Sequence, residues 1–376
     1  MAMAAKVPPF KADVVGSLLR PPAIFAARAQ RERGESTDIA LRQIESAAIE
    51  EAVALQKSVG LEVCTDGEFH RRHWFLDFLE KIDGVTVKGG LAVKFHNEQG
   101  DIEFSPPRFE VHGRMKRVRG LAVDDFKDLK GIAARHGLLP KQPIPSPTIL
   151  HFRGGRQAID RKIYPDIDGF VADVIAVYRE EIAALYDAGC RYLQIDETNL
   201  PFLCDPKLRD TVRAMGEDPD KLPGFYARLL NAILDGKPAD LTVCMHMCRG
   251  NHESAWVAEG GYDRVAEIVF GEIKLDGYFL EYDSPRAGGF EPLRFLGPNK
   301  VAVLGLVTTK KPQLETKDEL KRRIEAAAKI VPLERLALSP QCGFASTIRG
   351  NALTVEDERR KLALIVEVAR DIWGTA

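Results

Sequence analysis

Eight short β-rich runs recur along the chain, and a helical pattern follows each of them. Strands that alternate with helices indicate a parallel sheet, and eight such units favour a closed (β/α)8 TIM barrel. A doubly wound open sheet is the alternative, but no GxGxxG turn follows the first run. The runs are ADVVGS (12–17), LEVCTDGE (61–68), PIPSPT (143–148), RYLQIDE (191–197), LTVCMHMC (241–248), GYFLEYD (277–283), VAVLGLV (301–307) and LALSPQC (336–342).

Several intervening segments carry signals for the start or the end of a helix. Residues 167–189 place apolar side chains three and four positions apart, and Gly189 then predicts the end of that helix. Thr316 stands three residues before Glu319, and Thr354 three before Asp357, which predicts a capping box at the start of each of the last two helices.

One stretch, roughly residues 82–135, breaks this rhythm. It contains DGVTVKGGLAVKFHNEQGDIEF and further turn-rich segments, so it predicts a β-rich excursion from the loop after the second strand. No internal repeat or interdomain linker is evident. The sequence therefore predicts a single domain, residues 1–376, with one excursion.

Composition limits the classes of partner. Of the 376 residues, 45% are hydrophobic and 29% charged, and the formal net charge is −2. A charge so close to neutrality predicts no nucleic-acid or membrane partner, and it leaves a homo-oligomer open. The start of the chain lacks a secretion signal, so we expect a cytoplasmic protein whose six cysteines stay reduced. Cys64 and Cys190 are expected in the core, and Cys204 in a loop.

Each predicted strand runs from apolar residues into polar or small ones. In a barrel these ends meet at one face, where the chemistry of such folds is found. The ends are Gly16-Ser17, Asp66-Gly67-Glu68, Ser146-Pro147-Thr148, Asp196-Glu197, His246-x-Cys248, Glu281-x-Asp283, Thr308-Thr309-Lys310 and Gln341-Cys342-Gly343.

The stretch CMHMCRGN (244–251) points to a metal. In a strand, alternate residues share a face, so His246 and Cys248 project together while the two methionines point away. Glu281 and Cys342, at neighbouring strand ends, complete a set of N, S and O donors typical of tetrahedral zinc. Cys244 lies on the same face, one layer deeper, where we expect it to fill the core.

These residues resemble a known family. The chain is similar to the catalytic C-terminal barrel of cobalamin-independent methionine synthase, and more closely to its single-barrel relatives. The resemblance extends over nearly the whole chain, through VGSLLRPP, TDGEFHR, LQIDETNL, MHMCRGN, FLEYDS, LGLVTTK and LSPQCGFAS.

The resemblance implies a zinc-dependent methyltransferase that acts on a thiol, homocysteine, with a second substrate as methyl donor. It implies that Zn²⁺ is held by the four donors at positions 246, 248, 281 and 342. Residues around Ser17 would hold the substrate carboxylate. Glu68 and Asp196 would hold its ammonium group and are the candidate catalytic residues, although a helix cap or a salt bridge would also explain them. Lys310 is the remaining candidate for substrate binding.

The chain departs from the family pattern in its donor half. Full-length members carry a second, N-terminal barrel. After the third strand these members have Asn-Trp-Ser, and the Trp stacks on folate; this chain has Ile149-Leu150-His151-Phe152 there. They also have a His at the position of Lys310. The donor thus stays open between a folate, a methylated corrinoid and another electrophile. A basic run, residues 70–73, either meets an anionic donor or forms a solvated turn.

Three other functions compete with this one. An epoxyalkane:coenzyme M transferase uses the same zinc–thiolate chemistry, but it needs a cationic sulfonate pocket in place of Glu68 and Asp196. A decarboxylase on the same type of barrel needs no zinc. A non-catalytic zinc protein does not account for the acidic strand ends.

Overall fold

The computed structural model describes residues 7–88, 93–97, 100–104 and 108–376. Its strands are β1 (Val63–Cys64), β2 (Asp83–Lys88), β3 (Val93–Asn97), β4 (Gly100–Phe104), β5 (Arg108–Lys116), β6 (Leu139–Pro140), β7 (Gln142–Pro145), β8 (Tyr192–Glu197), β9 (Thr242–Met247), β10 (Gly277–Glu281), β11 (Val301–Val307) and β12 (Leu336–Pro340).

Six of these strands form a parallel sheet in the order β12-β11-β10-β9-β8-β7. Every residue of β8, β9 and β10 is buried, as expected for strands covered on both faces. Asp196 on β8 lies opposite His246 on β9, and Glu281 closes β10 opposite Gly305 of β11. Because the strands are parallel, their carboxyl ends bring these side chains to one edge.

The strand succession continues beyond both edges of this sheet. β1 pairs in parallel with β6, which directly precedes β7. At the other edge, Ala12 forms a parallel bridge with Leu338 of β12, while Leu18 donates its N–H to the carbonyl of Gly67 (3.1 Å), just after β1. The segment from Ala12 to Leu18 therefore lies between β12 and β1.

Two of the predicted strands are shorter than the sequence indicates. The first run contributes a single bridge, because Asp13 Oδ1 accepts the N–H of Val14 (2.7 Å) and Asp13 Oδ2 that of Phe10 (3.2 Å). These local bonds use N–H groups that a ladder would need. The second run forms only the two residues of β1. The other six predicted runs coincide with β7 to β12.

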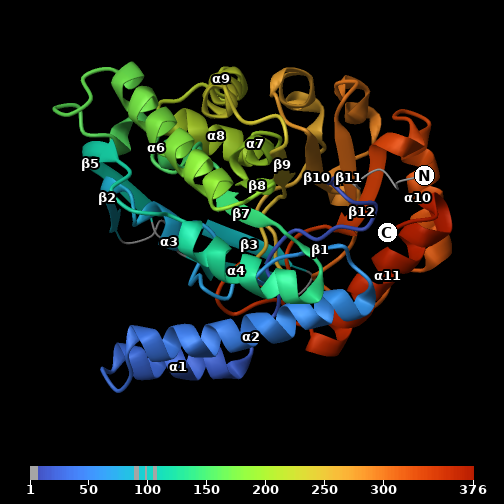
Figure 1. The fold of residues 1–376 in the computed structure, drawn as a ribbon. Coiled ribbons are helices and arrows are strands. Elements are labelled where there is room, and N and C mark those ends of the chain that lie inside the picture. The colour runs from blue at the N-terminus through green and yellow to red at the C-terminus, as the bar shows by residue number, and fades with distance from the viewer. Residues whose placement is uncertain (1–6, 89–92, 98–99, 105–107) are drawn as a thin grey trace.

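Helices lie on either side of the strands (Figure 1). The α-helices are α1 (Pro22–Glu32), α2 (Asp38–Val59), α3 (Leu76–Leu79), α4 (Val123–His136), α5 (Ile149–Phe152), α6 (Ile167–Asp187), α7 (Asn199–Phe202), α8 (Pro206–Ala214), α9 (Leu222–Leu234), α10 (Lys317–Ala328) and α11 (Val355–Trp373). Shorter helical segments are η1 (Gly155–Ala158), η2 (Tyr262–Arg264), η3 (Glu267–Glu272), η4 (Pro285–Ala287), η5 (Glu291–Phe295) and η6 (Leu333–Arg335). Within the described ranges, no helix combines the length and hydropathy that crossing a bilayer requires.

The predicted helix boundaries are confirmed at α6, α10 and α11. Gly189 follows α6 with φ +102°, in the left-handed region that glycine tolerates. The hydroxyl of Thr316 accepts the N–H of Glu319 (3.2 Å) at the start of α10. At α11, Thr354 and Asp357 form both bonds of a capping box.

The excursion is β-rich as predicted over β2 to β5, which pair as two antiparallel ribbons, β2 with β5 and β3 with β4. The prediction is wrong for its last part, because residues 123–136 form α4. Val123, Phe126 and Leu129 recur every three residues and are buried on one face, a helical period that the charged residues between them obscure. Residues 89–92, 98–99 and 105–107 of the predicted excursion lie outside the described residues.

Candidate metal centre and substrate pocket

One histidine and two cysteines meet at the carboxyl ends of β9 and β12. His246 lies in β9, Cys248 follows its last residue, and Cys342 follows β12. One ligand atom from each lies within 4.8 Å of the others, and all three side chains are buried. We call these three residues the His–Cys cluster. Both methionines of β9 are fully buried on the opposite face of the strand, as alternation predicts.

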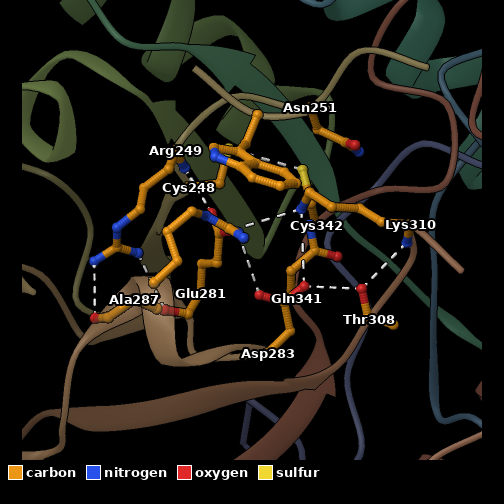
Figure 2. Close-up of polar contacts among 12 residues, drawn as sticks. Cys248, Arg249, Asn251, Glu281, Asp283, Ala287, Thr308, Lys310, Gln341 and Cys342 are labelled. Atoms are coloured by element: carbon orange, nitrogen blue, oxygen red, sulfur yellow. Dashed lines mark hydrogen bonds and ion pairs between the residues drawn. The ribbon is translucent and has the colours of Figure 1, made fainter. Parts of the chain in front are cut away.

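The donor atoms of this cluster fit a zinc ion. Among the described residues, neither ring nitrogen of His246 has a hydrogen-bond partner although both are buried. The sulfurs of Cys248 and Cys342 lie 3.8 Å apart (Figure 2). The hydrogen bond from Cys248 lowers the pKa of Cys342 well below its ordinary value, and His246 adds to this effect. Buried imidazole and thiolate donors are the ligands that structural and catalytic zinc sites use.

Glu281 lies beside the cluster but is engaged elsewhere. Its carboxylate accepts the backbone N–H of Arg249 (2.6 Å), pairs with Arg286 and lies 3.6 Å from Lys310 Nζ (Figure 2). Burial alone would raise the pKa of Glu281, but the charges of Lys310, Arg286 and Arg249 outweigh it and lower this pKa to about 2. Glu281 is therefore a buried, ionised carboxylate. It does not belong to the His–Cys cluster, whose ligand atoms lie within 4.8 Å of one another.

Lys310 lies beside Glu281 and is not among the residues that line the pocket of the His–Cys cluster described below. Its ammonium group is 3.8 Å from Asp283. The carboxylate of Asp283 accepts a hydrogen bond from the hydroxyl of Thr308 (2.8 Å). Lys310, Asp283 and Arg286 line a separate cavity together with Trp256. The structure thus places Lys310 beside the carboxylates of Glu281 and Asp283.

The His–Cys cluster forms part of the wall of a pocket of about 730 Å³, including space open to solvent. Ser17, Glu68 and Asp196 line the same pocket. The structure therefore places the three predicted metal ligands with N and S donors in one pocket with three other predicted residues. Those three were predicted to hold the carboxylate and ammonium groups of the substrate.

Glu68 is held in a strained backbone conformation at the bottom of this pocket. Its φ is +60°, unusual for a residue with a Cβ, and its N–H is bound by Asp66 Oδ1 (2.8 Å). Its Oε1 lies 3.6 Å from Arg71, while its Oε2 is buried and has no partner among the described residues. A Cβ at Gly16 would lie 2.7 Å from Oε1, so any other residue there would require this carboxylate to shift.

The two pocket carboxylates have raised pKa values. Burial, opposed by the charge of Arg71 and supported by that of Asp196, raises the pKa of Glu68 to about 7. Burial also raises the pKa of Asp196, although His246 and Arg71 oppose it. One oxygen of Asp196 accepts a hydrogen bond from Gln194 Nε2 (2.7 Å). Such a pair gains most from a cation, because the cation favours its charged form.

Ser17 packs against the loop that carries Cys342. Its hydroxyl accepts the N–H of Ala345 (3.3 Å) and its carbonyl accepts that of Phe344 (2.8 Å). A Cβ at Gly343 would overlap the Ser17 hydroxyl, so this glycine permits the contact. The first predicted run is thereby tied to the metal-ligand loop.

The basic run at 70–73 is mostly engaged inside the protein. His70 binds Glu45 (2.9 Å), Arg71 bonds the carbonyl of Pro143, and Arg72 pairs with Asp77 (2.8 Å). Of this run only His73 lines the pocket.

Sequence reasoning missed other residues of the pocket wall. Phe95 comes from the excursion, where β3 bonds to the segment after β9: His96 and Trp256 exchange backbone hydrogen bonds of 2.6 and 2.9 Å. Arg153 follows α5, one residue beyond the stretch compared with the family pattern, and its position there was the signal that could have identified it.

The remaining cysteines lie apart from the cluster. Cys64, Cys190 and Cys244 are fully buried in the core as predicted, and burial raises the pKa of the first two to about 12. Cys204 is also buried, and burial raises its pKa to about 11. None of the six cysteines is in a disulfide.

Comparison with known proteins gives matches over most of the chain. The family model for the catalytic domain of cobalamin-independent synthase matches residues 161–371. The uncharacterized protein YxjH of Bacillus subtilis (strain 168) is 44% identical over 97% of this chain and 95% of its own length. A 5-methyltetrahydropteroyltriglutamate–homocysteine methyltransferase of Bacillus velezensis is 24% identical over 90% of this chain and 40% of its own length.

A solved structure is similar over the same range. It is the crystal structure of a Listeria monocytogenes protein described as a candidate vitamin-B12 independent methionine synthase. Its sequence is 38% identical, the alignment covers 98% of this chain and 99% of that one, and the TM-score is 0.78.

Proposed function

Because this chain belongs to the cobalamin-independent methionine synthase family and is a methyltransferase of that family, we propose that it transfers a methyl group to the thiol of homocysteine and so forms methionine. The observation that carries the proposal is the His–Cys cluster in one pocket with Glu68 and Asp196. This pocket offers soft donors for a metal at one place and two carboxylates for an ammonium group at another.

We assign a zinc ion to the His–Cys cluster, with Glu281 as the fourth ligand. The ring nitrogens of His246 without partners and the close sulfurs of Cys248 and Cys342 support the assignment. Zinc bound there would lower the pKa of a substrate thiol, so that the thiolate nucleophile is present near neutral pH.

Two cations beside Glu281 engage this carboxylate. Lys310 and Arg286 lie within ion-pair distance of it and keep it ionised. Glu281 would therefore keep compensating charges around it whether or not it also held the metal, and a buried carboxylate without such charges would be costly. Glu281 would be the ligand whose place a substrate thiol takes, and Lys310 would be a positioning residue for it.

Glu68 and Asp196 orient the acceptor. An ammonium group between them would satisfy the free Oε2 of Glu68 and favour the charged form of both groups. Ser17, tied to the loop of Cys342, would lie near the carboxylate of the same amino acid. The acceptor is thereby held by its amino acid end with its sulfur toward the cluster, a pre-orientation that lowers the entropic cost of the transfer.

The succession of strands supports a (β/α)8 barrel formed by one domain. β1, β6 with β7, and β8 to β12 follow one another, and the segment from Ala12 to Leu18 contacts β12 and the loop that follows β1. We also place the enzyme in the reducing cytoplasm, because Cys248 and Cys342, 3.8 Å apart, must stay reduced to bind a metal.

The function is tested by incubating zinc-loaded protein with homocysteine and one donor at a time, either 5-methyltetrahydrofolate or methylcobalamin, and measuring methionine by mass spectrometry. Methionine formation that a chelator abolishes is the expected result. Coenzyme M with an epoxide serves as the contrasting pair. If coenzyme M is alkylated while homocysteine is neither bound nor methylated, the proposal fails.

A further inference from the structure

Gln194 lies one layer deeper than the substrate pocket, on the strand that carries Asp196. It belongs to β8, its side chain is fully buried, and it is not among the residues that line the pocket. Because alternate residues of a strand share a face, Gln194 and Asp196 point to the same side of the sheet. The strand register agrees, since Gln194 pairs with Cys244 where Asp196 pairs with His246. Gln194 therefore lies directly behind a residue of the pocket wall.

The amide nitrogen of Gln194 makes two hydrogen bonds. Nε2 donates to Oδ1 of Asp196 (2.7 Å) and to the backbone carbonyl of Val15 (2.7 Å). An amide NH2 group carries two hydrogens, and a carbonyl or an ionised carboxylate can only accept, so both hydrogens are used. The two acceptors also determine the orientation of the amide, because Oε1 in the place of Nε2 would face two other oxygens.

Packing alone does not account for a glutamine at this position. Oε1 of Gln194 is buried, and no described residue donates a hydrogen bond to it. A core position that served packing alone would be filled at lower cost by an apolar side chain of similar size, since burying an amide without all its hydrogen bonds is unfavourable. The feature that an apolar side chain could not supply is the pair of hydrogen bonds from Nε2.

Gln194 also connects two parts of the acceptor site that lie far apart in the chain. Val15 stands two residues before Ser17, in the segment that contacts the metal-ligand loop. The next carbonyl of this segment, that of Gly16, accepts the hydroxyl of Thr65 (2.6 Å). Side chains from other elements thus hold consecutive carbonyls, and the one on Val15 comes from the strand of the ammonium-binding carboxylate. The two ends of the amino acid site are thereby fixed relative to each other.

The bond to Oδ1 restricts the carboxylate of Asp196. An aspartate side chain can rotate about two bonds, and a ligand that ordered it on binding would bear the entropic cost. A hydrogen bond already present in the free protein removes part of this cost. It also occupies Oδ1, which leaves Oδ2 for a ligand in the pocket that Asp196 lines.

We propose that Gln194 is a positioning residue for the acceptor. It holds the carboxylate of Asp196 in the orientation that receives the substrate ammonium group, and it fixes that carboxylate relative to the segment of Ser17. This inference rests on the proposed function, since it takes Asp196 to bind the ammonium group of homocysteine.

A binding experiment separates positioning from a general structural role. Homocysteine and 4-mercaptobutyrate, the same thiol without the ammonium group, are titrated calorimetrically into zinc-loaded protein. Gln194→Met, with a side chain of similar length and no N–H donor, should lower the preference for homocysteine over 4-mercaptobutyrate about tenfold or more, the usual effect of a hydrogen bond to a charged group. The affinity for 4-mercaptobutyrate should stay the same.

Two further variants complete the experiment. Gln194→Glu keeps the shape of the side chain, but its carboxyl group can donate to one acceptor at most, so it should also lose preference for homocysteine. Tyr278→Phe is the matched control, because it removes another buried hydrogen bond of a sheet strand, to the carbonyl of Val269 on β10's outer side. This control should retain the full preference.

An unchanged preference in Gln194→Met or in Gln194→Glu would overturn the proposal. An equal loss of affinity for both thiols would do so as well, since it would show a structural role, and so would failure of both variants to fold. In each of these cases the original protein still prefers homocysteine, and the proposed function stands. If the original protein binds the two thiols equally, the assignment of the acceptor in the proposed function is refuted, and this inference with it.

Discussion

Replacing Glu68 with glutamine should weaken homocysteine binding and at the same time stabilise the free protein. The loss of affinity follows from one charge-assisted hydrogen bond to the substrate ammonium group, about 1.5 to 3 kcal/mol. This corresponds to roughly 10- to 150-fold in the dissociation constant at pH 8. Asp196 remains in the variant and still carries part of the binding.

The substitution lowers the affinity for homocysteine but raises the stability of the free protein, and the gain in stability depends on pH. Burial raises the pKa of Glu68 from 4.5 to about 7 in the folded protein. The folded state therefore binds more protons than the unfolded state between these values, and stability falls as the pH rises through this range. The ionised carboxylate costs up to ~3 kcal/mol above pH 7, a figure that already includes the favourable charge of Arg71. The glutamine variant should thus melt higher than the original protein at pH 8, and the difference should shrink at pH 5.

Two measurements check this prediction. Calorimetric titration of zinc-loaded protein compares homocysteine with 4-mercaptobutyrate, which has the same chain and thiol but no ammonium group. Thermal unfolding at pH 5 and pH 8 gives the stability. Glu325→Gln, exposed on α10, is the matched control. The reasoning is refuted if Glu68→Gln binds homocysteine as tightly as the original protein, or if 4-mercaptobutyrate loses as much affinity as homocysteine.

Other changes have equally definite outcomes. Cys248→Ser and Cys342→Ser should each lose most of their zinc, whereas Cys244→Ser should keep it. Elemental analysis after gel filtration measures the zinc content. Full zinc in both Cys248→Ser and Cys342→Ser would contradict the ligand assignment. Gly343→Ala should displace Ser17 and raise the KM for homocysteine about tenfold, with zinc content unchanged; an unaltered KM would show that this contact has no role in binding. Zinc should leave the protein as the pH falls below about 6, because His and Cys ligands protonate; retention of zinc at pH 4 would argue against these donors.

Patterns repeated along the chain predicted most of the fold. Alternation in β9 assigned His246 and Cys248 to one face and their methionine neighbours to the other, since side-chain direction in a strand depends only on position. Caps at Thr316 and Thr354 were predictable because they use contacts within four residues. The first run was harder, because the side chain of Asp13 competes with the ladder for backbone N–H groups.

The outer wall of the pocket depends on contacts between distant segments. Phe95 reaches the pocket only because β3 bonds to the backbone of Trp256, and no local pattern near residue 95 encodes that pairing. Arg153 is similar: its sequence neighbours do not reveal that its side chain lines two cavities. The ammonium group of Lys310 lies 3.6 Å from Glu281, and Lys310 lines a cavity other than the pocket of the His–Cys cluster. Its role in substrate binding stays a prediction.

The proposed chemistry requires a substrate thiol to bind the metal at the His–Cys cluster, and X-ray absorption at the zinc K-edge measures the number of sulfur ligands. Zinc in the free enzyme should show two sulfur ligands, from Cys248 and Cys342, and homocysteine should raise the number to three as an oxygen ligand leaves. A sulfur count that stays at two when homocysteine is bound would contradict it.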